Sequence, residues 1–243
     1  MRLAIIADIH GNYRALQAVL VDIALLGVNR IVSLGDNIGY GPEPEEVVQT
    51  LRKYQIESVM GNHELGLISR GYFNRLHAVA RESLVLTRSL LSEGSLAWLE
   101  RLPVAQVCCG ARLVHGCPPQ SITVYLHAPS DNRLRRLFYS YPERICFAGH
   151  THDFGFYQQD GPVLSRRALT VERVELGPHN RYLILPGSVG QPRDTLNWHA
   201  KYLLWDLEAQ VIEVRAVPYD VQTTIRLLKE RDFPAPNGQR LFW

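Results

Sequence analysis

Three short apolar segments near the start of the chain each end in a turn that carries glycine or polar residues. They occupy residues 3–7, 30–34 and 56–60. Between them, residues 13–26 repeat leucine, valine and isoleucine at helical spacing, and residues 42–52 open with prolines and acids, which favour the first turn of a helix. Strands that alternate with helices in this way form parallel sheets with right-handed crossovers. The start of the chain therefore predicts an α/β fold.

The second half of the chain has a different pattern, in which short apolar segments follow one another closely. A helical apolar stripe over residues 74–101 precedes this part. Beyond it the pattern predicts a hairpin at 105–114, strands at 145–148, 163–164, 169–174 and 182–185, a second hairpin at 202–217 and a final helix at 220–231. No linker or repeat interrupts residues 1–243, so we expect a single domain in which two sheets pack together with helices outside.

Composition sets broad limits on the class of protein. The 243 residues are 46% hydrophobic and 21% charged, which allows a sizeable core and argues against disorder. The net charge of +2 is too small to indicate nucleic-acid binding. The apolar run before Asp8 is too short for a signal peptide, and no segment reaches the length of a membrane span. We therefore expect a cytoplasmic protein that binds neither a membrane nor a nucleic acid.

The four cysteines carry no metal-site or redox spacing. Cys108, Cys109, Cys117 and Cys146 contain no pair separated by two residues. If residues 105–109 form a strand, the adjacent pair Cys108 and Cys109 point to opposite faces of it. We expect all four to be small buried hydrophobes in a reducing compartment.

Side chains that can bind metals gather just after the predicted strands. Ligands of open α/β sheets collect at the carboxyl ends of strands, so side chains far apart in the sequence can converge there. All the donors are nitrogen or oxygen, which suits divalent Mn, Fe, Zn, Ni or Co. Seven ligands are too many for one ion but fit two, and the Asp36 carboxylate can bridge them. The candidate ligands are Asp8, His10, Asp36, Asn62, His115, His150 and His152.

The last two candidates are separated by a single residue. His150 and His152 follow the apolar run 145–148 directly, and taken alone each is either a turn residue or a ligand. On a strand-like backbone, residues i and i+2 point the same way. We therefore expect both imidazoles to face one centre, with Thr151 turned away.

Taken together, the motifs closely resemble those of the calcineurin-like metallophosphoesterases over residues 3–193. The resemblance implies a four-layer α/β/β/α sandwich of two mixed β-sheets flanked by helices. It also implies a two-metal phosphohydrolase in which a hydroxide between the ions attacks phosphorus. The motifs that carry it are Asp8-x-His10, Gly35-Asp36, Gly61-Asn62-His63-Glu64, His115 and Gly149-His150-Thr151-His152.

The resemblance also implies roles for individual residues. His63 corresponds to the family's general acid or electrostatic stabiliser, and the alternative is a residue that only hydrogen-bonds to a ligand. One ion would be held by Asp8, His10, Asp36 and His152, and the other by Asp36, Asn62, His115 and His150.

Two segments depart from the better-known relatives. Serine/threonine phosphatases and dinucleoside-tetraphosphate hydrolases carry an arginine shortly after Gly-Asp, but residues 37–42 contain none. The chain therefore looks more like the small bacterial and archaeal phosphodiesterases, and both of the other classes stay as alternatives. Leu185 stands where these small enzymes have asparagine. Arg193 is either a bidentate phosphate clamp or a surface residue, and Asn62 and Asn12 are further candidates for contact with phosphate.

We accordingly predict hydrolysis of small phosphate esters or nucleotides with two divalent ions, manganese being favoured. A non-catalytic binding scaffold with the same fold is the alternative from another class. Residues 65–101 are predicted to form a helical insertion over the active site, in which Tyr72, Phe73, Arg75 and His77 are the first candidates for substrate contact. Tyr40 is expected at the surface, and the sequence does not indicate an oligomeric state.

Overall fold

The first of two mixed sheets is built around β1 (Arg2–Ile6) in the computed structural model, which describes residues 1–194 and 196–242. Strand β1 pairs in parallel with β2 (Arg30–Ser33) and antiparallel with β11 (Ala200–Asp206). The strand order of this sheet is β3 (Glu57–Ser58), β2, β1, β11, β12 (Val211–Val217), β9 (Arg173–Glu175).

The second sheet also has a parallel centre with antiparallel edges. Strands β5 (Ala111–Val114) and β10 (Arg181–Pro186) both run parallel to β6 (Ile145–Ala148), which lies between them. The full order is β4 (Ala105–Cys108), β5, β6, β10, β7 (Phe154–Asp160), β8 (Val163–Arg167). The carboxyl ends of the parallel strands are therefore available in both sheets for a shared site.

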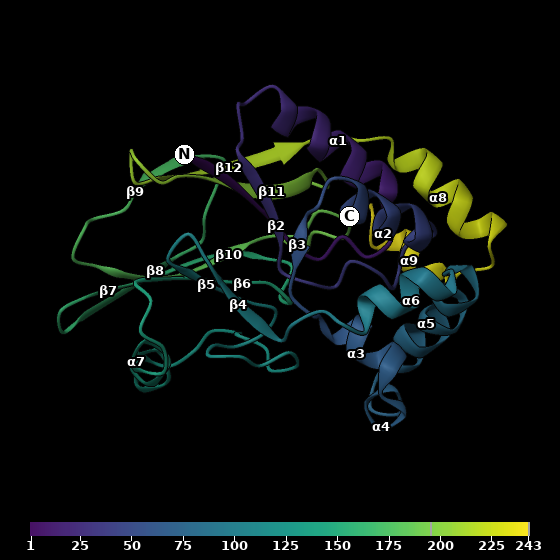
Figure 1. Cartoon of the computed structure of the whole chain (residues 1–243), viewed down its shortest axis with the longest axis horizontal. Coiled ribbons are helices and arrows are strands. Elements are labelled where there is room, and N and C mark those ends of the chain that lie inside the picture. The colour runs from purple at the N-terminus through teal and green to yellow at the C-terminus, as the bar shows by residue number, and fades with distance from the viewer. Residues whose placement is uncertain (195, 243) are drawn as a thin grey trace.

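Helices cover the outer faces of the two sheets and give the four layers that we expected (Figure 1). Against the first sheet lie α1 (Tyr13–Ala24), α2 (Pro44–Lys53) and α8 (Val221–Glu230), with α9 (Ala235–Gln239) beside α8. Helix α7 (Asp131–Tyr139) covers the second sheet. No helix in the described part of the chain has the length and apolar character that a membrane crossing requires.

Alternation along β1 explains why this strand is apolar without interruption. Leu3 and Ile5 pack into the core between the two sheets, whereas Ala4 and Ile6 pack against the helices on the outer face. A strand buried on both faces needs apolar side chains at every position. The expectation of a fully buried first strand is thus confirmed.

A separate group of helices lies beside the sheets in Figure 1. It consists of α3 (Asn62–Ile68), α4 (Arg70–Phe73), α5 (Ala78–Leu90) and α6 (Glu93–Leu99). The helical character predicted for 74–101 is confirmed, but the segment is interrupted. Ser92 begins α6 because its side chain accepts a hydrogen bond from the backbone N–H of Ser95, as an N-cap does.

Several predicted strands have different limits in the structure. The third strand is only the two residues of β3, because the backbone N–H of Met60 donates to the carbonyl of Pro103 and leaves the sheet ladder. The segment 169–174 contributes only its end to β9, and β7 was not predicted. Within β7, Gly155 provides space for the Leu185 side chain, so this strand lacks the regular apolar pattern.

The prediction for the adjacent cysteines was wrong. Cys109 lies in the turn after β4 with φ of 53°, and not in the strand. This left-handed backbone brings the two sulfurs to the same side, where Cys108 Sγ and Cys109 Sγ are 3.5 Å apart. All four cysteines are free.

Candidate metal centre

The candidate ligands lie in loops at one edge where the two sheets meet. From the first sheet, β1 leads into Asp8 and His10 and β2 leads into Asp36. From the second sheet, β5 leads into His115 and β6 leads into the two remaining histidines. Asn62 is the first residue of α3. All seven side chains are buried, so a charge placed among them would be shielded from water.

One group of ligand atoms consists of Asp8, His10, Asp36 and His152, which offer atoms within 4.8 Å of one another. The Nε2 atoms of His10 and His152 are 3.0 Å apart. Nε2 of His152 lies 3.5 Å from Oδ1 of Asp8, and Nε2 of His10 lies 3.7 Å from Oδ2 of Asp36. Such a group can hold a small divalent cation.

A second group lies next to the first and shares Asp36 with it. Asp36, His115 and His150 also offer atoms within 4.8 Å of one another. Nε2 of His115 is 3.3 Å from Oδ2 of Asp36, 3.1 Å from Nδ1 of His150 and 3.1 Å from Oδ1 of Asn62. The structure therefore brings all seven candidate ligands together in two adjoining groups.

Backbone carbonyls orient three of the imidazoles. Nδ1 of His115 donates to Leu34 O at 2.8 Å, and Nδ1 of His152 donates to Gln191 O at 2.7 Å. His10 makes the equivalent contact with Ile38 O at 3.3 Å. A ring that donates through Nδ1 presents the lone pair of Nε2 to the centre when it is neutral. Facing lone pairs 3.0 Å apart repel unless a proton or a cation lies between them, so the donor set suits a bound cation.

The electrostatics of the centre agree with this geometry. Burial lowers the pKa of His10 and His152 well below the usual value and that of His150 to about 3, which leaves these rings neutral. Burial also acts to lower the pKa of His115, but the Asp36 carboxylate outweighs it and raises this pKa to about 9. Without a cation, a proton on His115 thus balances Asp36, and a metal ion would have to displace it.

Five of the ligands adopt a backbone conformation that L-residues rarely use. The φ angles are 52° for Asp8, 51° for His10, 51° for Asp36, 72° for His150 and 63° for His152. The expectation of a strand-like backbone through the two last histidines was therefore wrong, although their rings do face one centre. Left-handed residues cost of order 1 kcal/mol or more each and accumulate at functional sites, where neighbouring structure enforces them.

Glu64 provides part of that neighbouring structure, although it was assigned no role from the sequence. The buried carboxylate accepts backbone N–H groups from Gly61 at 2.8 Å, Asp36 at 3.0 Å and Asn37 at 2.7 Å. It thereby joins the start of α3 to the loop that carries Asp36. The signal was present, because a glutamate three residues after the N-cap is the spacing of a capping box.

We expect Glu64→Gln to lower the free energy of unfolding by about 2–3 kcal/mol, since the new amide N–H₂ cannot accept the backbone donors that remain buried. Urea denaturation of the metal-free protein measures the loss. Glu82→Gln, at an exposed position of α5, is the matched control and should change the stability by less than about 0.5 kcal/mol. An equal effect of the two substitutions would contradict the role given to Glu64.

His63 lies beside the two groups and belongs to neither. Its Nε2 is 4.0 Å from Oδ2 of Asp36, and its ring contacts the rings of His10 and Tyr40 at centroid distances of 4.7 and 4.6 Å. Burial lowers the pKa of His63 to about 4, so the ring is neutral near neutral pH. Within the described residues its Nδ1 has no hydrogen-bond partner. Tyr40, expected at the surface, is buried against these rings.

Asn12 and Arg193, the two candidates for phosphate contact outside the ligand set, differ in the number of hydrogen-bond donors that remain free. Asn12 caps α1, accepting from Ala15 N and Thr224 Oγ1 and donating to Gly190 O and Tyr219 Oη. These bonds use its full capacity, so the structure gives Asn12 a structural role in place of the expected phosphate contact.

Arg193, by contrast, is exposed and stands at the rim of the site. Its charge contributes to lowering the pKa of both His10 and His152, which places the guanidinium within electrostatic range of the first ligand group. Its Nη2 donates to Oε1 of Gln191 in a weak contact of 3.4 Å. A guanidinium has five N–H donors, so this contact leaves further donors for a phosphate.

Comparisons with known proteins agree with this arrangement. Residues 1–154 match the family model described as calcineurin-like phosphoesterase. The chain is 33% identical to the uncharacterized protein MJ0912 of Methanocaldococcus jannaschii, covering 99% of this chain and 97% of the relative. It is 33% identical to a metallophosphoesterase from Sphaerobacter thermophilus, whose crystal structure matches with a TM-score of 0.86 over 99% of this chain and 98% of that one.

A shorter match involves a named enzyme. The chain is 30% identical over 105 residues to the symmetrical bis(5′-nucleosyl)-tetraphosphatase of Baumannia cicadellinicola, covering 42% of this chain and 36% of the relative.

Proposed function

Because the chain belongs to the calcineurin-like phosphoesterase family, a family of phosphate-ester hydrolases, we propose that it is a two-metal hydrolase of small phosphate esters or nucleotides. The observation that carries the proposal is the pair of adjoining ligand groups that share Asp36. One carboxylate between two cation positions is the arrangement that two-metal phosphoryl transfer requires.

In this proposal the first ion is held by Asp8, His10, Asp36 and His152, and the second by Asp36, Asn62, His115 and His150. The donor set fits divalent transition ions, and manganese is the metal we favour among Mn, Fe, Zn, Ni and Co. Such ions lower the pKa of water and neutralise the charge of a phosphate.

His63 acts on the departing oxygen. At neutral pH its ring is uncharged, and with Nδ1 unpartnered within the described residues the Nε2–H can donate toward the centre. A neutral N–H in that place donates a hydrogen bond to the negative charge that develops on the leaving group, whereas the role of general acid requires the ring to take up a proton first. Groups in this role contribute about 10²–10⁴ in rate.

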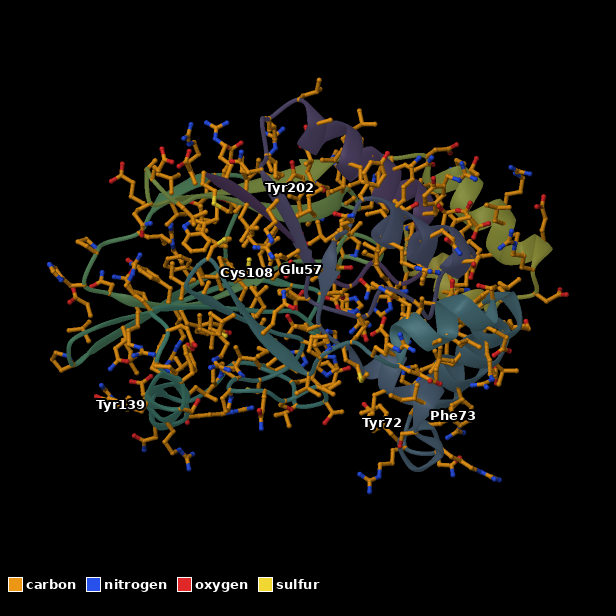
Figure 2. The ribbon with its side chains drawn as sticks, in the orientation of Figure 1. Glu57, Tyr72, Phe73, Cys108, Tyr139 and Tyr202 are labelled. Atoms are coloured by element: carbon orange, nitrogen blue, oxygen red, sulfur yellow. The ribbon has the colours of Figure 1, made fainter. Side chains whose placement is uncertain are left out.

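Arg193 and the helical segment 65–101 complete the proposal. The guanidinium of Arg193 binds phosphate oxygens at the rim, because its fork matches their geometry. We place the helical group at the substrate side of the centre, with Tyr72 and Phe73, labelled in Figure 2, as its first candidates for substrate contact. Residues 37–42 lack the arginine found in protein phosphatases and dinucleoside polyphosphate hydrolases, so the activities of these two classes are second candidates.

Hydrolysis of bis(p-nitrophenyl) phosphate and p-nitrophenyl phosphate by protein loaded with Mn²⁺ tests the function. We expect turnover that a chelator abolishes and that returns when the metal is restored. Arg193→Ala should raise KM by about tenfold, the loss of a charge-assisted hydrogen bond. Protein of verified metal content that hydrolyses neither ester nor any nucleotide would contradict the proposal and favour a binding scaffold.

A further inference from the structure

The orientation of the His63 ring is set by packing. Among the described residues its buried Nδ1 has no hydrogen-bond partner, and its Nε2 lies 4.0 Å from Oδ2 of Asp36. The ring is close to the backbone of Gly39, where a Cβ would lie 2.2 Å from Nδ1. On its other contacts it meets the rings of His10 and Tyr40. The place of the imidazole beside the centre therefore depends on the groups that surround it.

Tyr40 is the largest of these neighbours and is itself not a metal ligand. Its ring meets that of His63 at a centroid distance of 4.6 Å and an angle of 64°, and that of His10 at 4.8 Å and 52°. The side chain is only 6% exposed. Its hydroxyl lies 3.2 Å from Nε2 of His77, at the start of α5, so the contact with His63 is made by the ring.

Two helices hold the loop that carries Tyr40. From α5, Thr87 donates from Oγ1 to the carbonyl of Gly39 at 2.8 Å. From α9, Asn237 donates from Nδ2 to the carbonyl of Tyr40 at 2.8 Å and to Oγ of Ser83, on α5, at 2.8 Å. Asn237 is buried, so these hydrogen bonds are shielded from water. The loop is thus fixed between α5 and α9.

The support from α9 comes from outside residues 1–154, the part of the chain that matches the family model. Helix α9 packs against α8 and lies between it and the helical group in Figure 1. Arg240, directly after α9, adds a second contact, because its guanidinium lies over the Tyr40 ring at 5.8 Å from the centroid. A segment near the end of the chain therefore supports a ring that contacts His63.

We propose that Tyr40 is a positioning residue for His63, and that its ring, fixed by α5 and α9, keeps the imidazole where Nε2–H meets the departing oxygen. This inference rests on the proposed function, in which His63 donates to that oxygen. It gives α5 and α9 a part in the reaction apart from substrate contact. A displacement of about 1 Å can cost a positioned group about a hundredfold in rate, so support of this kind has a measurable effect.

Two phosphodiesters that differ only in the leaving group separate the positioning of His63 from other damage. Methyl phenyl phosphate and methyl p-nitrophenyl phosphate keep the same methyl ester, but phenolate is the more basic leaving group and depends more on a hydrogen-bond donor. In Tyr40→Leu, which keeps an apolar side chain but no ring, we expect kcat to fall about tenfold more for the phenyl ester than for the nitrophenyl ester, at unchanged metal content. Tyr40→Phe keeps the ring and loses the bond to His77, and it should leave the ratio of the two rates as in the wild type.

Further variants assign the effect to His63. His63→Ala should show the same selective loss, and adding Tyr40→Leu to it should cost little more, as for residues that act through one another. Asn237→Ala leaves the Tyr40 ring in place but frees its loop, so it should give the same pattern to a smaller extent, and it replaces Tyr40→Leu if that variant does not fold. Tyr139→Ala is the control, because Tyr139 is 78% exposed on α7. Equal losses for the two esters in Tyr40→Leu, or no loss for either, would overturn the inference while leaving the hydrolase intact.

A structural measurement covers the case in which the wild type hydrolyses neither ester, which would count against the proposed function itself. Crystal structures of the metal-loaded wild type, Tyr40→Leu and Tyr40→Phe show where the His63 ring lies. We expect the ring to leave its place 4.0 Å from Asp36 Oδ2 in Tyr40→Leu and to keep it in Tyr40→Phe. A His63 ring that stays in place in Tyr40→Leu overturns the inference, whatever the activity.

Discussion

Asp36→Asn should abolish two-metal occupancy and lower kcat by about a thousandfold or more, equivalent to about 4 kcal/mol of transition-state stabilisation. Asp36 is the residue common to both ligand groups, and its Oδ2 lies 3.3 Å from His115 Nε2 and 3.7 Å from His10 Nε2. The amide of asparagine has nearly the same shape but no charge, so it cannot offset two cations. The other oxygen of Asp36, Oδ1, accepts a hydrogen bond from the backbone N–H of His63 at 2.8 Å, and the amide oxygen of asparagine can still accept this bond.

Elemental analysis and thermal unfolding distinguish lost metal from lost fold. The melting temperature of the wild type should rise on addition of Mn²⁺, because a ligand that binds only the folded state stabilises it by mass action. That rise should be small or absent in Asp36→Asn. Asp153→Asn is the control, since Asp153 lies in the same loop as the last two histidines yet belongs to neither group. Two bound ions per chain in Asp36→Asn, with activity near that of the wild type, would refute the bridging role.

Much of the architecture follows from local patterns. The strands β1, β2 and β6 are short runs of apolar residues because both of their faces are buried, and each ends where polar side chains enter the site. Since the carboxyl ends of neighbouring parallel strands meet at one edge of a sheet, the order of strands indicates that Asp8 and Asp36 converge. The four-layer fold and the division of the ligands into two groups, including His150 from the second sheet, were implied by the resemblance of the motifs to those of the calcineurin-like phosphoesterases.

Other features depend on contacts that no local pattern encodes. Positive φ at His150 and His152 is enforced by tertiary hydrogen bonds, such as the one from His150 N–H to Asp8 Oδ2 at 3.1 Å, and residue type gives no sign of it. Asn12 was predicted to contact phosphate. Two of its hydrogen-bond partners, Tyr219 and Thr224, lie more than two hundred residues away in the chain. The sequence therefore could not show that the Asn12 amide has all of its hydrogen bonds inside the fold.

Tyr40 illustrates a different difficulty. The glycines on both sides of it favour a surface position, yet it is buried because α5 and Asn237 of α9, 197 residues later in the chain, hold its loop. The roles of Glu64 and Gly155 were predictable in part. The capping-box spacing indicates a glutamate that binds the start of a helix, and a glycine within a strand indicates a close approach of another group. The sequence does not reveal which distant residue packs against such a position, as Leu185 packs against Gly155.

Gly39→Ala is expected to reproduce most of the loss caused by His63→Ala, although it changes no functional group. Gly39 has φ of 125°, and a Cβ there would lie 2.2 Å from Nδ1 of His63, far inside van der Waals contact. The ring also contacts the rings of His10 and Tyr40, so it cannot make room for the new methyl group and keep its present position. A displaced donor no longer meets the departing oxygen, and kcat should fall by about 10²-fold or more.

The double variant separates this effect from general damage. In a His63→Ala background the obstructed ring is absent, so adding Gly39→Ala should cost little further activity, the non-additivity expected of residues in contact. Gly161→Ala is the matched control, because Gly161 also has a positive φ, 53°, but nothing lies within 4 Å of its Cβ position. Backbone strain alone would make the two glycine variants alike in kcat. Only the steric link to His63 predicts that Gly39→Ala lowers turnover while Gly161→Ala does not, and that both keep the full metal content.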